Sequence, residues 1–357
     1  MDARTGILEL FELIEDPRRA QAKRHRLPKV LFMLLFGQAM GAETLEEVVT
    51  HCEERLEWIQ EYVATDGGVP SERTFGRVLQ MLDPDLLPDL YAEVLGRLDD
   101  KVHHIAIDGK VGRGVGAIRT LHAYECEEKR LLGSVLIEEG RGERSAIPQL
   151  LHLLDLAGNV VSMDAGFCYE PILQEVLARG GDYVVALKGN QRGWQEEARQ
   201  VTAIMRPASA VVVDTSHGRT TEVIVRAYPT ANIIEAPGIK TLFSVNTCRV
   251  RGQEIQEETR WFMSSLIAAP EDLADLVRRH WAIENNLHGT LDLLLGDDQC
   301  RHRDRAAAAN RSFLRKLALL GFERYRRHHP KKTFRSLRAS IIVSLPNWRS
   351  YVRGFFE

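Results

Sequence analysis

The segment NVVSMDAGFCYEPILQEVLARGGDYVVALKGN, residues 159–190, decides the fold class of this chain. Its two ends, 159–164 and 182–190, are short runs rich in β-branched residues, which predict two buried strands. The residues between them, 171–179, have the apolar spacing of a helix, and a Gly-Gly pair follows where that helix would end. Strands interleaved with a helix in this way predict an α/β sheet.

The segments before this unit extend the same sheet. HHIAID (103–108) predicts another buried strand, and residues 121–139 predict two strands around the polar turn Glu127–Lys129. This pair gives the sheet an antiparallel opening. Residues 145–156 have the spacing of an amphipathic helix. We therefore expect a mixed α/β sheet flanked by helices, of which residues 101–193 form the first part.

The chain changes character after residue 193. From 194 to 262, a helix is followed by short alternating runs with polar breaks, which predict a β-rich insertion. Residues 263–320 return to helices and would form the second part of the α/β core. The end of the chain, 321–357, is basic, and we expect it to be loosely packed.

Residues 1–100 have helical apolar spacing and predict a separate all-helical domain. Ser71 is placed to cap one of these helices, with Arg73 and Arg77 left on its outer face. A helix, a glycine-containing turn and a second helix with outward arginines could form a helix-turn-helix reader of DNA. On the pattern alone, generic helical packing is the better interpretation.

The composition is that of a globular protein, with 357 residues, 44% hydrophobic and 27% charged. Five cysteines form no CxxC pair, so neither a zinc ribbon nor a disulfide framework is indicated, and we expect a reducing cytoplasm. No signal peptide or bilayer-spanning run is recognised, so no membrane partner is expected. The net charge is −3, but residues 301–357 hold fifteen Lys or Arg against three acidic residues, which leaves −15 (−3 minus +12) for the rest. The basic end is a candidate for phosphate contacts.

Asp108 and Asp164 each follow an apolar strand run, at the carboxyl end where open α/β sheets place their sites. Taken alone, each is as well explained as a turn residue, because a glycine follows closely. Glu284 lies in a predicted helix, 270–291, seven residues from an apolar residue on either side, which places it on the apolar face. We expect Glu284 to be buried, and a buried carboxylate needs a cation nearby.

Three converging carboxylates would repel one another, and divalent metal ions would satisfy them. Oxygen ligands suit Mg²⁺, with Mn²⁺ as a second choice. Two such ions would activate a water or a 3′-hydroxyl and stabilise the leaving oxygen of a phosphodiester. His280, Glu284 and His288 form a stripe at four-residue steps that could instead hold zinc, although no further ligand completes that set. The chain has no GxxxxGK[ST] loop, so no nucleotide cofactor is expected.

Polar residues that follow the predicted strands would surround the acids with phosphate donors. These residues are Lys110, Arg113, Lys188, Asn190 and Gln191. Each alone is an ordinary loop residue, and only their clustering at strand ends favours a polyanionic substrate. His280 and His288 could contact phosphate in the same way or support the acids from behind.

Several short motifs occur in a fixed order and together resemble one known family. They are IDGK (107–110), LHAY (121–124), AIPQLLHLLDL (146–156), VVSMDAG (160–166), GGDYVVALKGNQ (180–191), HGRTTE (217–222), ETRWFMSSL (258–266) and HWAIENNLH (280–288). This set is similar to the bacterial insertion-sequence DDE transposases of the H-repeat-associated group. The helical opening resembles the domain that precedes their catalytic core.

The resemblance implies an RNase H-like core in which Asp108, Asp164 and Glu284 form the DDE triad, with Mg²⁺-dependent cleavage and joining of the ends of a DNA element. It also implies double-stranded DNA as the partner, and a homodimer on DNA because two ends are joined. His217 and Arg219 in the insertion are further expected DNA contacts. Two alternatives stay open: a catalytically inactive, transposase-derived DNA-binding protein, and an RNase H-like nuclease without strand transfer.

Overall fold

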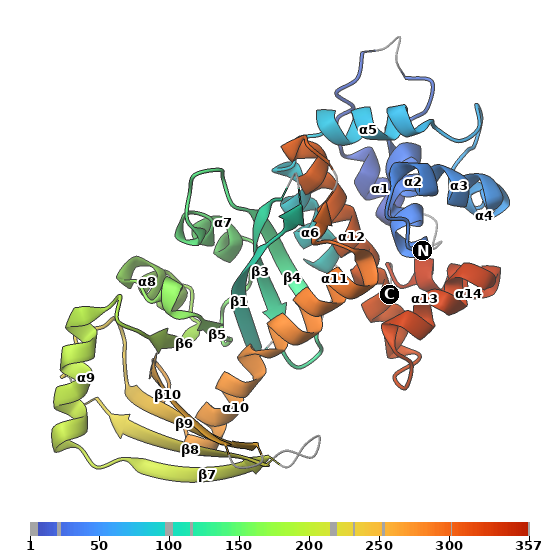
Figure 1. Ribbon diagram of the computed structural model, residues 1–357. Coiled ribbons are helices and arrows are strands. Elements are labelled where there is room, and N and C mark those ends of the chain that lie inside the picture. Colours follow the sequence, from blue (N-terminus) through green and yellow to red (C-terminus); the bar gives the residue numbers. More distant parts are fainter. Residues whose placement is uncertain are drawn as a thin grey trace.

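A nine-stranded mixed sheet forms the centre of the computed structural model (Figure 1). The model describes residues 6–19, 23–96, 103–114, 117–214, 220–230, 233–251, 254–300 and 302–355. The strand order is β4-β3-β1-β5-β6-β10-β9-β8-β7, in which β1, β5 and β6 run parallel and all other neighbours are antiparallel. The strands are β1 (His104–Val111), β3 (Arg119–Glu125), β4 (Arg130–Leu136), β5 (Val160–Met163), β6 (Asp182–Leu187), β7 (Ala208–Asp214), β8 (Thr220–Pro229), β9 (Thr241–Arg251) and β10 (Glu254–Ser264). The predicted mixed α/β sheet with an antiparallel opening is confirmed.

Alternate side chains of the central strands enter two separate cores. Ile105 and Ile107 pack with the helices on one face, α7 (Ile147–His152), α8 (Glu170–Ala178) and α9 (Arg192–Ile204). Ala106 packs on the other face, against the helices that follow β10. Because strand side chains alternate with a period of two, Asp108 and Lys110 lie on the same face as Ala106.

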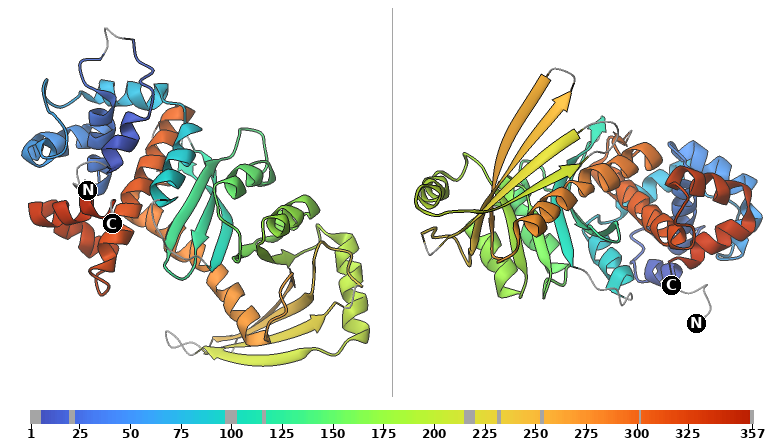
Figure 2. Two further views of the ribbon diagram at one scale, coloured as in Figure 1. Left: turned by 180° about the vertical axis from the view of Figure 1, so that it is seen from behind. Right: turned by 90° about the horizontal axis from the view of Figure 1, so that it is seen from below.

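The β-rich block predicted for 194–262 is not a separate layer. Strand β10 pairs with β6 from Trp261 opposite Leu187 to Ser264 opposite Val184, so β7 to β10 continue the central sheet. Helix α10 (Pro270–His280) covers one face of this extension, where its Leu273 and Val277 pack with strand residues. Figure 2 shows the extension projecting from the core as one curved surface.

The helical opening is confirmed for the described residues up to 96. It consists of α1 (Gly6–Glu12), α2 (Leu27–Met40), α3 (Leu45–Glu54), α4 (Leu56–Gln60), α5 (Glu72–Met81) and α6 (Leu86–Gly96). The Ser71 side chain caps α5 by accepting a hydrogen bond from Thr74 N–H. As predicted, Arg73 and Arg77 are exposed on the outer face of this helix.

The basic end is not loosely packed, contrary to expectation. Helices α12 (Arg305–Arg327), α13 (Phe334–Val343) and α14 (Leu345–Arg353) pack against the N-terminal helices, and the two groups lie side by side in Figures 1 and 2. The Trp348 ring lies 4.7 Å from the ring of Phe36 in α2. Their apolar residues, spaced at helical intervals between the basic ones, are buried: Leu337, Ile341, Trp348, Tyr351 and Val352.

The segment after α10 changes its helical geometry. A π-helix, Ile283–His288, follows α10 and leads into α11 (Gly289–Leu295). Ile283 and Leu287 take the buried positions of the π-helix, whereas Glu284 is exposed. The expectation that Glu284 is buried opposite a cation was therefore wrong, because it assumed an unbroken period of 3.6 residues, and π-turns rotate the side chains that follow.

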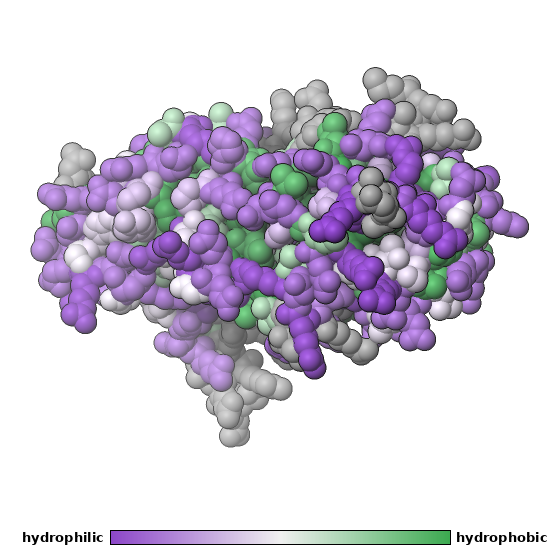
Figure 3. Space-filling view, turned by 90° about the horizontal axis from the view of Figure 1, so that it is seen from above, coloured by the Kyte–Doolittle hydropathy of each residue, from purple (hydrophilic) through white to green (hydrophobic). Residues whose placement is uncertain are grey.

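The two remaining strands, β2 (Arg113–Gly114) and β11 (Gln299–Cys300), form a small separate sheet. Short 3₁₀ turns occur at Glu143–Ser145 and Ala165–Phe167. The face shown in Figure 3 is covered mainly by hydrophilic side chains, with hydrophobic atoms visible between them. Among the helices that the structure describes, none is long and apolar enough to cross a membrane.

Candidate acidic site

Asp108 is the fifth of the eight residues of β1, with 22% of its side chain exposed. The strand continues beyond the predicted end, and Asp108 directly follows the last residue that pairs with β5, Ile107. The backbone N–H of Gly109 donates a hydrogen bond to Asp108 Oδ1 at 2.8 Å. Burial, together with the negative charges of Glu284, Asp164 and Glu143, raises the Asp108 pKa to about 7, although the hydrogen bond from Gly109 acts in the opposite direction. The charges of three carboxyl groups from distant parts of the chain therefore reach Asp108.

Asp164 directly follows β5 and is half exposed. Lys188, which follows β6, is its ion-pair partner. The two side chains meet on one face, with Lys188 Nζ 3.6 Å from Asp164 Oδ1. Lys188 itself is 63% exposed, so its ammonium can contact both the carboxylate and an incoming phosphate.

The loop after Asp164 is fastened by three polar side chains. Asn190 Nδ2 donates to the carbonyl oxygen of Ala165 at 3.0 Å, and the Gln191 amide donates to the carbonyl oxygen of Cys168. Arg144 Nε donates to the carbonyl oxygen of Gly166 at 2.6 Å. Asn190 and Gln191, expected as phosphate donors, thus have a role in holding the loop in place. Arg144 was not predicted.

Glu143 is a fourth acid that the sequence interpretation missed. It lies in the 3₁₀ turn before α7, on the opposite side of β1 from the π-helix, where it approaches Gly109 closely. A Cβ added at Gly109 would lie 2.3 Å from Glu143 Oε1. The close approach of the Glu143 carboxylate to β1 therefore requires a glycine after Asp108. Because Glu143 belongs to no periodic segment, no pattern in the sequence indicated it.

Histidines connect both ends of the π-helix region to the sheet. Ser162 Oγ in β5 lies 2.8 Å from His280 Nδ1 and 2.8 Å from His104 Nε2. At the other end, His288 Nε2 lies 3.0 Å from His122 Nδ1 in β3.

Burial lowers the pKa of His280 and of His288 to about 4, so both rings are neutral at pH 7. The sequence left two roles open for these histidines, phosphate contact and support of the acids. Because both rings are neutral and hydrogen-bonded to the sheet, the second role is favoured.

Lys110, which was expected to contact phosphate, lies below the surface. Only 6% of its side chain is exposed, and its Nζ is 2.6 Å from Asp292 Oδ1 and 3.6 Å from Asp297 Oδ2. Arg315 Nη1 also lies 3.8 Å from Asp297. Lys110 thus joins β1 to α11 and α12 through buried ion pairs and does not face a ligand. The reason is the strand period, which turns Lys110 to the side of the helices.

The remaining predicted DNA contacts are placed only in part. Arg113 is exposed on β2. His217 and Arg219 lie outside the described residues. Within the described ranges, no three His, Cys, Asp or Glu side chains are grouped closely enough to hold a metal ion as they stand, and this includes the zinc stripe considered above.

Comparison with known proteins identifies the family. A family model for the transposase DDE domain matches residues 101–320, and a model for the domain associated with it matches residues 8–93. The chain is 30% identical over 339 residues to "Putative transposase YncI" of Escherichia coli O157:H7, with 88% of this chain and 86% of that protein covered. It is 29% identical over 338 residues to "H repeat-associated putative transposase YhhI" of Escherichia coli K12, covering 88% and 89%.

Among solved structures, a piggyBac transposase synaptic complex with hairpin DNA matches 98% of this chain and 77% of that chain, with a TM-score of 0.48 and 12% identity. The family model for the transposase DDE domain spans more than half of the chain, and the motif resemblance to H-repeat-associated transposases is confirmed. The chain belongs to the DDE transposase family.

Proposed function

We propose that this transposase cleaves and joins the ends of an insertion-sequence element, using Asp108, Asp164 and Glu284 as its catalytic acids. The observation that carries this proposal is the state of Asp108, whose pKa is raised to about 7 by burial and by three other carboxylates. Carboxylates held together at such a cost are typical of functional sites.

The donor set suits Mg²⁺ or Mn²⁺. Its members offer only carboxylate oxygens, and their mutual repulsion would be relieved by a divalent cation. Asp108 and Asp164 would hold the ions, and Glu284 would complete one coordination sphere. When bound, two such ions supply an activated water or 3′-hydroxyl and stabilise the leaving oxygen of a phosphodiester.

The protein itself orients the acids and receives the phosphate. Gly109 N–H fixes one oxygen of Asp108, and the exposed ammonium of Lys188 can neutralise a phosphate oxygen beside Asp164. Exposed Arg113, and His217 and Arg219 of the insertion, would also contact the DNA. Double-stranded DNA is the proposed partner, bound by two copies of the chain because two element ends are joined.

The test uses the full-length protein with Mg²⁺ and a plasmid that carries the DNA flanking its own gene, with cut and joined ends mapped. Asp108→Asn, Asp164→Asn and Glu284→Gln should each abolish both products while leaving DNA affinity nearly unchanged. The matched control is Glu57→Gln on α4, an exposed carboxylate among the N-terminal helices. Cleavage by Asp108→Asn at the parental rate would refute the assignment.

One observation favours the alternative of a DNA-binding protein without catalysis. Glu284 is exposed, and the described acids are not grouped as a metal site. In that case the parent would bind the flanking DNA but produce no Mg²⁺- or Mn²⁺-dependent cut. Cut ends without joined ends would instead indicate a nuclease that lacks strand transfer.

A further inference from the structure

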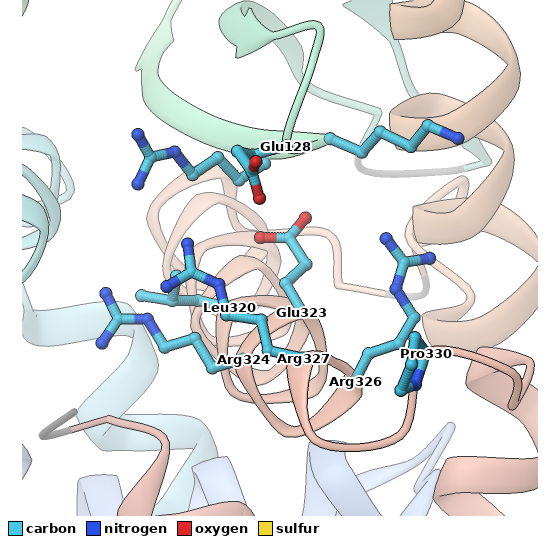
Figure 4. A pocket seen from close by; sticks show the side chains of 9 residues that line it. Glu128, Leu320, Glu323, Arg324, Arg326, Arg327 and Pro330 are labelled. Carbon is cyan, nitrogen blue, oxygen red and sulfur yellow. The ribbon is translucent and has the colours of Figure 1, made fainter. Parts of the chain in front are cut away.

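Two adjoining hollows lie between the turn that joins β3 to β4 and the carboxyl end of α12. The first has a volume of about 330 Å³, and the second has a volume of about 400 Å³. Four residues line both of them: Lys129, Glu323, Arg326 and Pro330. We call the two hollows together the basic groove. Figure 4 shows the first hollow, with Glu323 pointing from α12 toward the turn that carries Glu128.

The lining of the basic groove is mainly cationic. Its first hollow is lined by five cationic side chains against two acidic ones, Glu128 and Glu323. The cations are Lys129, Arg130, Arg324, Arg326 and Arg327. The second hollow adds Lys331 and Lys332. Arginine forks match phosphate oxygens, and ligand pockets for small apolar molecules have a different lining, so the groove suits a polyanion.

Lys129 has a backbone conformation that lysine rarely adopts. Its φ is +59°, and no other non-glycine residue in the described ranges has a positive φ. A glycine would serve this turn without the strain that a side chain adds in the left-handed region. The turn nevertheless carries a lysine, and that lysine lines both hollows. Retained strain of this kind is typical of functional positions.

Glu323 is the buried acid of the basic groove, only 8% exposed. The Leu131 backbone N–H donates a hydrogen bond to its carboxyl group, but its Oε2 has no hydrogen-bond partner among the described residues. Burial raises the Glu323 pKa to about 8, although Arg326, Arg324 and Arg130 act in the opposite direction. At pH 7 the carboxyl is therefore mainly protonated and can donate to a phosphate oxygen.

The other titratable groups around Glu323 do not change this state. Tyr91 on α6 and Tyr124 on β3 interact with it, and burial raises the pKa of both tyrosines, so they stay neutral. Glu128 lines the same hollow from the turn. A second acid on the wall makes a deprotonated Glu323 still less favourable there.

The basic groove adjoins the helix that carries Glu284. Asn286 and Thr290, from the π-helix and α11, line its second hollow. On the sheet side, Ile105 lies opposite the last residue of β3, next to the turn. Asp108 lies three residues after Ile105 along β1, which corresponds to about 10 Å at 3.3 Å per residue. A duplex with one phosphodiester at the acids can therefore place further phosphates at the groove.

We propose that the basic groove binds the backbone phosphates of the same double-stranded DNA on which the acidic residues act. This inference rests on the proposed function for its DNA substrate, but it concerns a separate surface. Lys129 and Lys332 would contact phosphates as point charges, and Arg326 and Arg327, which are not buried, would hold them through paired N–H groups. Protonated Glu323 would donate one further hydrogen bond.

The test measures the affinity of the full-length protein for a short duplex of its flanking DNA by fluorescence anisotropy, in EDTA, from roughly 50 to 200 mM salt. The variant Lys129→Gly with Lys332→Ala removes two charges and also relieves the turn. The plot of log affinity against log salt should lose about 0.9 of slope for each lost phosphate contact. Unchanged affinity and slope would overturn the proposal.

The matched control is Arg199→Ala, an exposed cation on α9 at the far end of the molecule, which should leave the slope unchanged (Figure 1). Because binding is measured without divalent metal, the result does not depend on the acids. Loss of cleavage in Asp108→Asn, together with an unchanged salt slope in the Lys129→Gly, Lys332→Ala variant, would support the catalytic assignment alone. A reduced slope in the groove variant with cleavage retained in Asp108→Asn would support the groove alone.

A second measurement tests Glu323. Between pH 7 and 9 the parent should lose severalfold in DNA affinity, because the Glu323 carboxyl ionises in this range and its negative charge repels the bound phosphate. The Glu323→Gln variant should show a smaller loss across the same range. If parent and variant respond equally to pH, Glu323 does not contact the phosphate and this part of the proposal is refuted.

Discussion

His122 Nδ1 in β3 lies 3.0 Å from Nε2 of His288, so the sheet holds the last residue of the π-helix that carries Glu284. His122 is fully buried, and its Nε2 lies 3.1 Å from Thr120 Oγ1. Burial lowers the pKa of both histidines, so neither is charged at neutral pH. One ring must donate to the other, which fixes the orientation of both.

His122→Ala should lower the cleavage rate by about 10- to 100-fold, the usual effect of removing a group that orients a site residue. DNA affinity should stay within twofold, because the substitution touches no exposed surface. Single-turnover cleavage and anisotropy measure the two effects separately. His152→Ala, an exposed histidine on α7, is the control. Equal losses of cleavage and affinity would argue against a positioning role.

Lys110→Met tests whether this lysine is structural. It leaves Asp292 and Asp297 without their shared cation, although Arg315 remains near Asp297. Stability should fall by roughly 3–5 kcal/mol, as expected for breaking a buried ion pair by removing one partner. Urea denaturation measures this loss. The salt slope of DNA binding should be unchanged, and a slope reduced by about one would restore Lys110 as a phosphate contact.

Gly109→Ala tests the approach of Glu143 to Asp108. The new methyl group would displace only the end of the Glu143 side chain, so the change in stability should be below about 1 kcal/mol. Cleavage should nevertheless fall if the position of Glu143 matters at the site. The double variant with Glu143→Ala removes the clash and should cleave no better than Glu143→Ala alone. Parental cleavage by Glu143→Ala would show that this fourth acid is dispensable.

Glu323 should make the stability of the protein fall with rising pH. Its folded pKa of about 8 is above its ordinary value of 4.5, so its contribution is complete below pH 4.5 and is lost as pH rises through 8. Between these values the loss is at most about 1.4 kcal/mol per pH unit. Urea unfolding at pH 6, 7.5 and 9 should therefore show a flatter profile for Glu323→Gln than for the parent. Parallel profiles would place the Glu323 pKa near its ordinary value.

The sheet and the site were predictable to different extents. The strand runs at 103–108, 159–164 and 182–190 were identified because a buried strand has a strong local signal. The pairing of β10 with β6 was not, since strand partners far apart in the chain leave no periodic trace. The same limit applies to the C-terminal helices, where a basic composition concealed the apolar residues that bury them.

The candidate site shows where local patterns stop being informative. Asp108 and Asp164 were predicted from the apolar runs that precede them, and the family resemblance implies Glu284 as the third acid. The π-helix that turns Glu284 outward depends on packing by Ile283 and Leu287, and no sequence period predicts it. Lys110 was assigned by its position in the chain, and no local pattern indicated that Asp292 and Asp297 would pair with it.

Helix α2 is buried along almost its whole length, and part of its cover comes from α12 and α13, almost three hundred residues later in the chain. During synthesis this part of the apolar surface of α2 therefore stays exposed until the last helices leave the ribosome. A prematurely terminated product would keep the strands of the sheet together with this exposed apolar surface. We expect such fragments to aggregate or be degraded. The protein products of truncated gene copies would therefore not accumulate as inhibitors that compete with the full-length protein.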